Sequence, residues 1–172
     1  MAVFGVVADV RRRIAIPIHN IAGDLVAYAG RWAGTPPNAE TDKYRLPPNF
    51  RKSLELFNID RAAEESPDDP LVIVEGFFDA IKLHQNGWRK VVAVMGSKIS
   101  DAQIELIRRN DALNSRVIVM FDEDDAGRQG REDAAARLAK FCFVKTHVFD
   151  NAGMQPEHLA AEEIQRILGG AS

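Results

Sequence analysis

Apolar and polar positions along the chain alternate between two patterns, which predict strands and helices in turn. Four short apolar runs recur through the last two thirds of the chain, each bounded by Gly, Pro or polar residues. Continuous runs of this length, rich in Val and Ile, are typical of strands buried on both faces of a parallel sheet. The four expected strands span residues 71–74, 91–94, 117–121 and 143–149.

The segments between these runs carry apolar residues at helical spacing. Asn86-Gly87 ends the first of them, and Ser100 with Gln103 forms a capping box at the start of the second. Gly169 is expected to stop the last helix. The expected helices cover residues 77–85, the segment that follows Ser100, residues 127–140 and residues 160–168. Strands separated by helices predict an α/β fold with a mostly parallel four-stranded sheet flanked by helices.

The first third of the chain has a different pattern. Residues 13–18 alternate, and Gly23-Asp24 separates them from a second apolar run over residues 25–29. This pattern predicts a hairpin in a small β-rich lobe, followed by a long loop with prolines over residues 35–50. The stretch 64–70 holds two prolines, four acids and no apolar residue, which makes it the clearest linker.

Charge is distributed unevenly between these parts. Residues 1–62 hold nine Lys and Arg against six Asp and Glu, whereas residues 63–172 hold 13 against 19. We therefore expect a basic lobe over residues 1–62, a linker over 63–70 and an acidic α/β domain over 71–172. This division suits an enzyme that binds phosphates with one part and metal with the other, although differences of this size also arise by chance.

Composition excludes several classes of protein. Cys142 is the only cysteine, so neither an internal disulfide nor a cysteine-rich zinc module can form, and its apolar surroundings predict a buried structural thiol. No apolar stretch is long enough to cross a bilayer, and no signal segment opens the chain. The expected compartment is therefore the cytoplasm, with no membrane partner.

Acidic residues follow two of the expected parallel strands. Glu75 comes directly after the first strand, and Asp122 and Asp124 follow the third. Functional residues of open parallel sheets gather at the carboxyl ends of the strands, and carboxylates clustered there repel one another unless a cation neutralises them. Asp122 and Asp124 are two residues apart, so both can face one ion while Glu123 points away.

The donor types favour Mg²⁺ or Mn²⁺ over zinc, because the sequence offers oxygen ligands and no cluster of histidine or cysteine. The alternative is a set of solvated acids at helix N-termini, where negative charge is favourable. The joint placement of the acids at two strands of one sheet favours the metal site.

These motifs resemble the Toprim domain, which is shared by bacterial-type primases, type IA and type II topoisomerases, OLD-family nucleases and RecR-like repair proteins. The resemblance is closest to the catalytic core of bacterial DnaG-type primases. Residues 75–79 are similar to the primase Glu-Gly-aromatic-x-Asp signature, Met95-Gly96-Ser97 to a Gly-Thr or Gly-Ser turn, and residues 122–128 to an Asp-x-Asp-x-Ala-Gly segment. Residues 13–18 and 23–31 resemble the strand pair of the N-terminal lobe of that core, and residues 43–48 and 52–58 resemble the segment that follows it, so the likeness covers nearly the whole chain.

Three features depart from full-length primases. Those proteins carry an N-terminal zinc-binding module and a C-terminal helicase-binding domain, and neither is found in this sequence. A fragment or a reduced relative is therefore expected, and any contact with the replicative helicase would depend on such flanking domains. The loop after the last strand reads Gln155-Pro156-Glu157 where primases often carry Asp-Pro-Asp, which weakens the expectation of a third metal position.

The resemblance implies metal-dependent nucleotidyl transfer by a DNA primase, with single-stranded DNA as template and nucleoside triphosphates as substrates. It assigns Glu75, Asp122 and Asp124 as catalytic metal ligands, with Asp79 as a further metal ligand. The residues expected to bind nucleotide or DNA are Arg13, Arg31, Lys43, Arg45, Lys52 and Arg128. For Arg128, an ion pair with Asp125 is the alternative.

Two other classes of protein would use the same acids. A Toprim nuclease or topoisomerase would cleave strands with them, and a non-catalytic Toprim module would bind DNA without needing the basic lobe. The only tyrosines, Tyr28 and Tyr44, lie in the lobe that resembles primases, which argues against a topoisomerase tyrosine.

Overall fold

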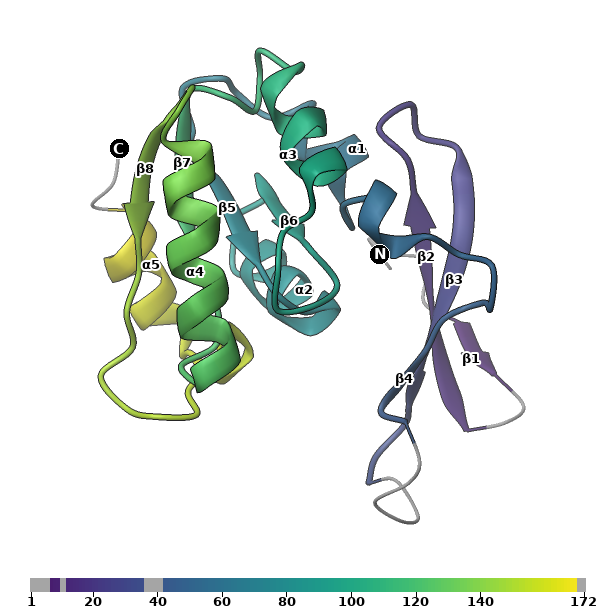
Figure 1. Cartoon of the computed structure of the whole chain (residues 1–172). Helices are drawn as coiled ribbons and strands as arrows, with labels where there is room; N and C mark the ends of the chain where they lie inside the picture. The colour runs from purple at the N-terminus through teal and green to yellow at the C-terminus, as the bar shows by residue number, and fades with distance from the viewer. Residues whose placement is uncertain (1–6, 10–11, 36–41, 170–172) are drawn as a thin grey trace. The chain divides into compact units, whose positions relative to one another are not determined.

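The computed structural model describes residues 7–9, 12–35 and 42–169 (Figure 1). The chain divides into two compact units, Met1–Arg51 and Lys52–Ser172. The first unit contains antiparallel sheet and the second contains a parallel sheet with helices. The expected α/β fold with a small β-rich N-terminal lobe is therefore confirmed. None of the described helices is long and apolar enough to span a membrane.

The first unit is built on a four-stranded antiparallel sheet of order β1-β2-β3-β4. Its strands are β1 (Val7–Asp9), β2 (Arg13–His19), β3 (Leu25–Trp32) and β4 (Tyr44–Arg45). Strands β2 and β3 form the expected hairpin, and the Asn20 side chain closes its turn by accepting the N–H groups of Ala22 and Asp24. Strand β4 lies inside the segment expected to be a loop, of which residues 36–41 fall outside the described residues.

The second unit contains a four-stranded, fully parallel sheet of order β6-β5-β7-β8. It opens with two short helices, η1 (Lys52–Leu54) and α1 (Ile59–Ala62). The elements that follow are β5 (Leu71–Val74), α2 (Phe77–Gln85), β6 (Val91–Ala93), α3 (Asp101–Arg108), β7 (Arg116–Val119), α4 (Asp125–Leu138), β8 (Phe143–Thr146), η2 (Pro156–His158) and α5 (Ala161–Gly169).

Strand β5 is buried on both faces, as its unbroken apolar run predicts. Leu71 and Ile73 belong to the main core, which also contains Ile107 of α3 and Leu138 of α4. Alternate residues of a strand point to opposite faces, so the other two side chains of β5 face the side on which α2 and α5 lie (Figure 1). Helices therefore cover both faces of the sheet and leave the carboxyl ends of its strands as the place for function.

The segment before β5 packs inside the second unit. Leu56, Ile59 and Ala62 are fully buried in its core. Further along, Lys90 is 2% exposed and its Nζ donates to the carbonyl of Ser66 at 2.7 Å, which anchors the stretch expected to be a linker. The boundary between the compact units therefore falls at residues 51–52 and not over residues 63–70, because apolar residues upstream of the proline-containing stretch fill the core of the α/β fold.

Gln103 helps to hold the segment before β5 in the second unit. Its side chain is 1% exposed and forms the expected capping box with Ser100 at the start of α3. Its Nε2 also donates to the carbonyls of Lys52, Glu55 and Val94, at 3.2, 2.7 and 3.0 Å. One buried amide therefore joins the η1 segment, the end of β6 and the N-terminus of α3.

Candidate metal centre

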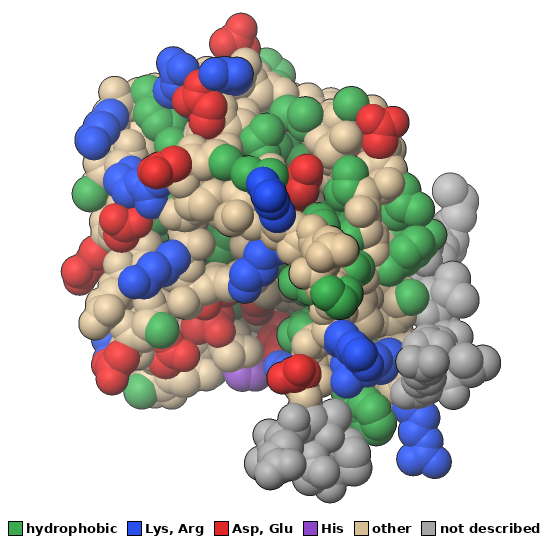
Figure 2. Space-filling model, turned by 45° about the vertical axis from the view of Figure 1, so that its right-hand side comes forward, with side chains coloured by type: hydrophobic (Ala, Val, Ile, Leu, Met, Phe, Trp, Pro, Cys, Tyr) green, Lys and Arg blue, Asp and Glu red, His purple; other side chains and the backbone are tan. Residues whose placement is uncertain are grey.

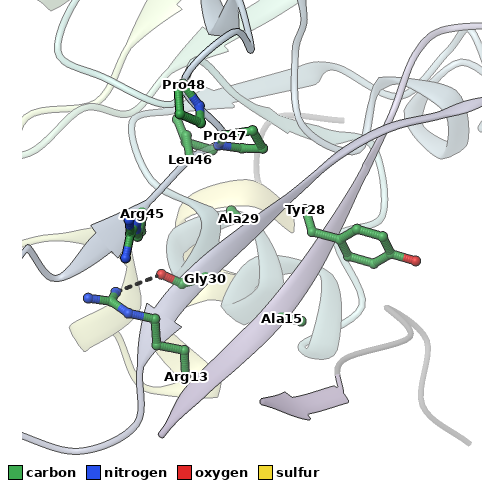
Figure 3. A pocket seen from close by; sticks show the side chains of 9 residues that line it. All are labelled: Arg13, Ala15, Tyr28, Ala29, Gly30, Arg45, Leu46, Pro47 and Pro48. Carbon is green, nitrogen blue, oxygen red and sulfur yellow. Dashed lines mark hydrogen bonds between the residues drawn. The ribbon is translucent and has the colours of Figure 1, made fainter. Parts of the chain in front are cut away.

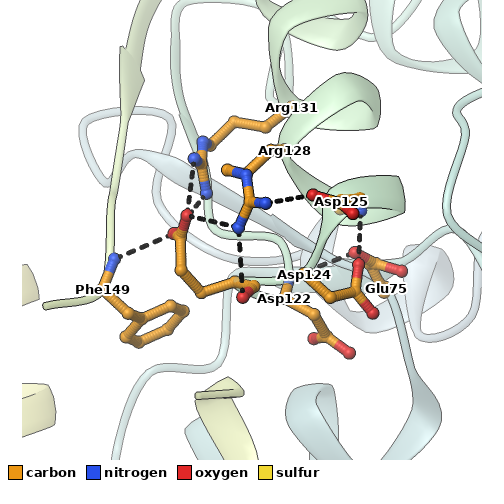
Figure 4. Close-up of polar contacts among 9 residues, drawn as sticks. Glu75, Asp122, Asp124, Asp125, Arg128, Arg131 and Phe149 are labelled. Atoms are coloured by element: carbon orange, nitrogen blue, oxygen red, sulfur yellow. Dashed lines mark hydrogen bonds and ion pairs between the residues drawn. The ribbon is translucent and has the colours of Figure 1, made fainter. Parts of the chain in front are cut away.

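Two turns at the carboxyl ends of β5 and β7 carry the acids. Glu75 follows β5 directly, and its Oε1 accepts the backbone N–H of Asp122, beyond β7, at 3.0 Å. This bond joins the two turns across neighbouring parallel strands. Asp124 is the N-cap of α4 and accepts the N–H of Gly127 at 2.8 Å, as Asp at an N-cap commonly does (Figure 4).

Asp79 extends the cluster from the first turn of α2. It is 5% exposed, and its Oδ2 accepts the N–H of Gly76 at 3.0 Å. Its Oδ1 accepts the N–H of Glu157 in η2, also at 3.0 Å. The loop at residues 155–157, where the sequence shows Gln-Pro-Glu, is thereby held beside the other acids.

Burial and the charge of neighbouring acids raise the pKa of two of these carboxyls, Asp122 and Glu75. The pKa of Asp122 rises to about 8, chiefly because the side chain is half-buried, and further because Asp79, Glu75, Asp124 and Glu157 repel its charge. The pKa of Glu75 rises to about 7, again mainly through burial, with Asp124 and Asp79 adding to the shift and the Asp122 N–H opposing it. At neutral pH the cluster therefore favours either a bound proton or a bound cation.

The chemistry of the donors fits a hard divalent cation. All the clustered side chains offer carboxylate oxygens, the ligands that Mg²⁺ and Mn²⁺ prefer. Asp122 Oδ1 is buried and has no hydrogen-bond partner, so it has a lone pair to give to an ion. Among the described residues, no group of three or more His, Cys, Asp or Glu side chains stands close enough to hold a metal ion as oriented. A shared ion therefore requires these side chains to turn toward one another.

Gly127 sets the close approach of α4 to the acids. A Cβ at this position would overlap the carbonyl oxygen of Asp122 and would lie 2.6 Å from Glu75 Oε1. The glycine in the Ala-Gly part of the sequence motif is thus required by the space between the two acidic turns.

The basic residues expected to bind nucleotide or DNA divide between the two units. Four of them, Arg13, Arg31, Lys43 and Arg45, lie in the first unit, and Lys52 and Arg128 lie in the second. On the face drawn in Figure 2, Lys and Arg side chains are interspersed with Asp and Glu.

Two arginines of the first unit line a pocket of about 300 Å³ with Tyr28 and Pro47 (Figure 3). Arg13 donates to the carbonyl of Gly30 at 3.0 Å, and its guanidinium lies 5.2 Å from the centre of the Trp32 ring. Arg45, on the short strand β4, is the second arginine of this pocket and is exposed. Arg45 is the more accessible of the two, because Arg13 is half-buried and its guanidinium also donates to the carbonyl of Asp42.

Lys52 lines a second pocket, of about 250 Å³, in the α/β unit. Its Nζ donates to the carbonyl of Met95 at 2.9 Å, and Gly96, Ser97 and Lys98 complete that side of the pocket. Lys98 was not singled out from the sequence; its only signal was its place directly after the Gly-Ser turn.

Arg128 forms an ion pair with Asp125, which was the alternative to a role in binding nucleotide or DNA. Its guanidinium pairs with Asp125 and lies 3.7 Å from Glu123 Oε1 (Figure 4). Its contacts are therefore with acids of its own helix and turn.

Residues 69–149 match the family model of the Toprim domain. The DNA primase of Synechococcus elongatus is 34% identical over 137 residues, covering 77% of this chain and 19% of that protein. The DNA primase of Staphylococcus aureus (strain COL) is 39% identical over 124 residues, covering 69% of this chain and 19% of that protein. The chain thus spans about a fifth of the length of these curated relatives.

Solved structures of DNA primases are also similar to this chain. A structure of the zinc-binding and RNA polymerase domains of Aquifex aeolicus primase matches with a TM-score of 0.77 and 28% identity, over 92% of this chain and 40% of that one. A DnaG primase catalytic domain bound to single-stranded DNA matches with a TM-score of 0.75 and 26% identity, over 96% of this chain and 54% of that one.

Residues 69–149 of the α/β unit therefore form a Toprim domain. Together with the antiparallel lobe, it makes the chain a relative of the catalytic cores of bacterial DnaG-type DNA primases, as the sequence motifs predict.

Proposed function

We propose that this chain carries out metal-dependent nucleotidyl transfer on nucleic acid, as the catalytic core of a DNA primase. The observation that supports this most is the cluster of Glu75, Asp79, Asp122 and Asp124 at the carboxyl ends of two parallel strands, with one buried carboxylate oxygen that lacks a partner. In the reaction, a 3′-hydroxyl oxygen bonds to the α-phosphorus of a nucleoside triphosphate, and pyrophosphate leaves as its bond to that phosphorus breaks.

The four acids would hold Mg²⁺ or Mn²⁺. When bound, such an ion lowers the pKa of the attacking hydroxyl and offsets the charge of the triphosphate. Burial of Asp122 limits competition from water for the site, and the Glu75 bond to the Asp122 N–H keeps the two turns in register. Asp124 orients α4, whose N-terminal dipole then faces the cluster.

Lys52 and Lys98 are suited to hold phosphates of the incoming nucleotide. Both line the pocket beside Ser97, and that residue's carbonyl packs directly against Gly130 of α4, the helix that Asp124 caps. The basic residues of the first unit, Arg13, Arg31, Lys43 and Arg45, would contact the triphosphate or the backbone of a single-stranded template. A primase catalytic domain of the same fold has been solved with single-stranded DNA bound.

The test is a labelled-nucleotide extension assay at low salt and high template concentration, run beside a strand-cleavage assay on the same DNA. Extension that needs Mg²⁺ or Mn²⁺ and is lost in Asp124→Ala would support the proposal. Cleavage without extension, lost in the same variant, would favour a Toprim nuclease. Neither activity, with metal still bound, would favour a non-catalytic DNA-binding module.

A further inference from the structure

The residue between the two aspartates of the acidic turn is buried. Glu123 is 6% exposed and pairs with Arg131, on the second turn of α4, which is also 6% exposed. The pair is bidentate: Arg131 donates to Glu123 Oε2 at 2.9 Å and to Oε1 at 3.3 Å. Arg131 therefore engages both oxygens of the Glu123 carboxyl group.

Glu123 also binds the segment that follows β8. Its Oε2 accepts the N–H of Phe149 at 3.2 Å, on the side away from Asp122 and Asp124 (Figure 4). Its backbone N–H donates to the carbonyl of Met154 at 2.9 Å, and its carbonyl accepts the N–H of Gly153 at 2.8 Å. One residue therefore connects the acidic turn to both ends of residues 149–154.

That segment leads to the cluster of acids at the candidate metal site. Three residues after Met154, the N–H of Glu157 donates to Asp79 Oδ1 at 3.0 Å. Displacement of Glu123 would thus move acids on both sides of the site.

A buried ion pair is a poor source of stability. The cost of removing two charges from water commonly equals or exceeds the attraction between them, and apolar pairs of the same volume often serve a fold as well. What a bidentate pair supplies is a fixed geometry between a helix and a turn. The location of this pair, between two candidate metal ligands, makes that geometry relevant to the site.

We infer that Glu123 and Arg131 are positioning residues for the metal site: they hold Asp122 and Asp124 on one side and the loop that carries Glu157 on the other. This inference rests on the proposed function. The two residues act through the acids and do not contact the ion or the substrate.

The experiment compares Arg131→Met, Glu123→Gln and the double variant with the wild type, all as the full chain. Arg137→Met is the matched control, because Arg137 is also on α4 and pairs with Asp101 and Asp133 away from the acidic turn. Urea unfolding gives stability, amide hydrogen exchange of the metal-free protein reports on residues 147–158, and titration with Mn²⁺ gives affinity.

Arg131→Met should be less stable, should exchange faster over residues 147–158, and should bind Mn²⁺ at least about ten-fold more weakly, as loss of a partner behind metal ligands commonly does. The double variant, which has no unpaired buried charge, should regain most of the stability but not the affinity. Arg137→Met should keep the affinity.

Two results would overturn the inference: unchanged exchange over residues 147–158 in both Arg131→Met and the double variant, or a double variant that recovers wild-type Mn²⁺ affinity together with stability. If the wild type binds no Mn²⁺, the proposed function fails, and the positioning role fails with it. The exchange data then show, independently of metal binding, whether Glu123 and Arg131 hold residues 147–158 in place.

Discussion

At the scale of single residues, the acids are distinguished by what surrounds each carboxylate. Asp125, the next acid along the chain, is exposed and pairs with Arg128, whereas Asp122 is half-buried among other acids. The sequence motif assigned Asp122 as a metal ligand and named Asp125 only as a possible partner of Arg128. Partial burial among other acids is what distinguishes Asp122 from Asp125 in the structure.

This difference predicts a pH dependence of stability without metal. The pKa of Asp122 is 3.8 in an unperturbed carboxyl and about 8 in the folded protein, so the folded state holds a proton that the unfolded state releases. Stability from that proton is full below pH about 4 and is lost as pH rises through about 8. Glu75 acts in the same direction, from 4.5 to about 7.

In EDTA, Asp122→Asn should therefore be less sensitive to pH and more stable than the wild type at pH 8. We expect a gain of about 1–2 kcal/mol, well below the full value of the shift, because solvent screens a half-buried carboxylate. Urea unfolding at pH 5 and pH 8 measures it, with Asp125→Asn as control. If the stability of the wild type and that of Asp122→Asn changed by the same amount between pH 5 and pH 8, the electrostatic account would be contradicted.

For Glu123, the direction of the side chain could be predicted from the sequence, but its partners could not. Its position between Asp122 and Asp124 predicted that its side chain points away from the side shared by those two, and in the structure it faces Arg131 and Phe149. The bidentate pair with Arg131, however, joins residues that belong to different elements, and the bond to Phe149 crosses to another strand end. Contacts of this kind depend on tertiary packing, so spacing along the chain does not reveal them.

At the scale of elements, the parallel sheet and its helices followed from the pattern of the sequence, because apolar runs and caps are local signals. Strand β5 and helix α2 have the expected bounds, and the other strands and helices of the α/β unit differ at their ends by a few residues. The short elements η1, α1 and β4 were not predicted. They are stabilised by distant partners, such as the Gln103 bonds to Lys52 and Glu55, and lack a periodic signal of their own.

The contact between α4 and the turn after β6 yields a prediction. A Cβ at Gly130 would overlap the carbonyl oxygen of Ser97, a backbone atom that cannot move aside cheaply. Gly130→Ala should therefore destabilise the protein by about 1–3 kcal/mol, even though alanine favours helix. Chemical denaturation measures the change.

Gln129→Ala is the matched control, since Gln129 is the exposed neighbour of Gly130 on α4 and should tolerate the change. Equal stability of Gly130→Ala and the wild type would mean that the helix can move away from the turn. The tight packing beside the Lys52 pocket would then not be required.

At the scale of the whole molecule, a basic lobe and an acidic Toprim domain suggest separate tasks for phosphate and metal. The sequence predicted this division from charge and motifs, but it set the boundary at residues 63–70. Proline and acid content marked a surface stretch there, whereas the burial of Leu56 and Ile59 shows that the α/β unit begins earlier. Local composition does not report which core a short apolar segment joins.

The proposed phosphate contacts predict weak, salt-sensitive binding of single-stranded DNA. The four basic residues proposed to contact the template, Arg13, Arg31, Lys43 and Arg45, give a slope of log affinity against log salt no steeper than about −3, at about 0.7 per contact. Fluorescence anisotropy with a labelled oligonucleotide over a KCl series measures it. Arg45→Ala should reduce the slope by about 0.7, and Arg109→Ala, a surface arginine paired with Glu105, should not. Affinity that does not change with salt would contradict a role for these residues.

The central claim is that the acids at the ends of β5 and β7 hold a divalent cation, and a Mn²⁺ titration followed by electron paramagnetic resonance tests it directly. The wild type should bind Mn²⁺ and Asp125→Asn should bind it equally well, whereas Asp122→Asn should lose most of the affinity while remaining folded. Equal binding by Asp122→Asn, or no binding by the wild type, would contradict the account.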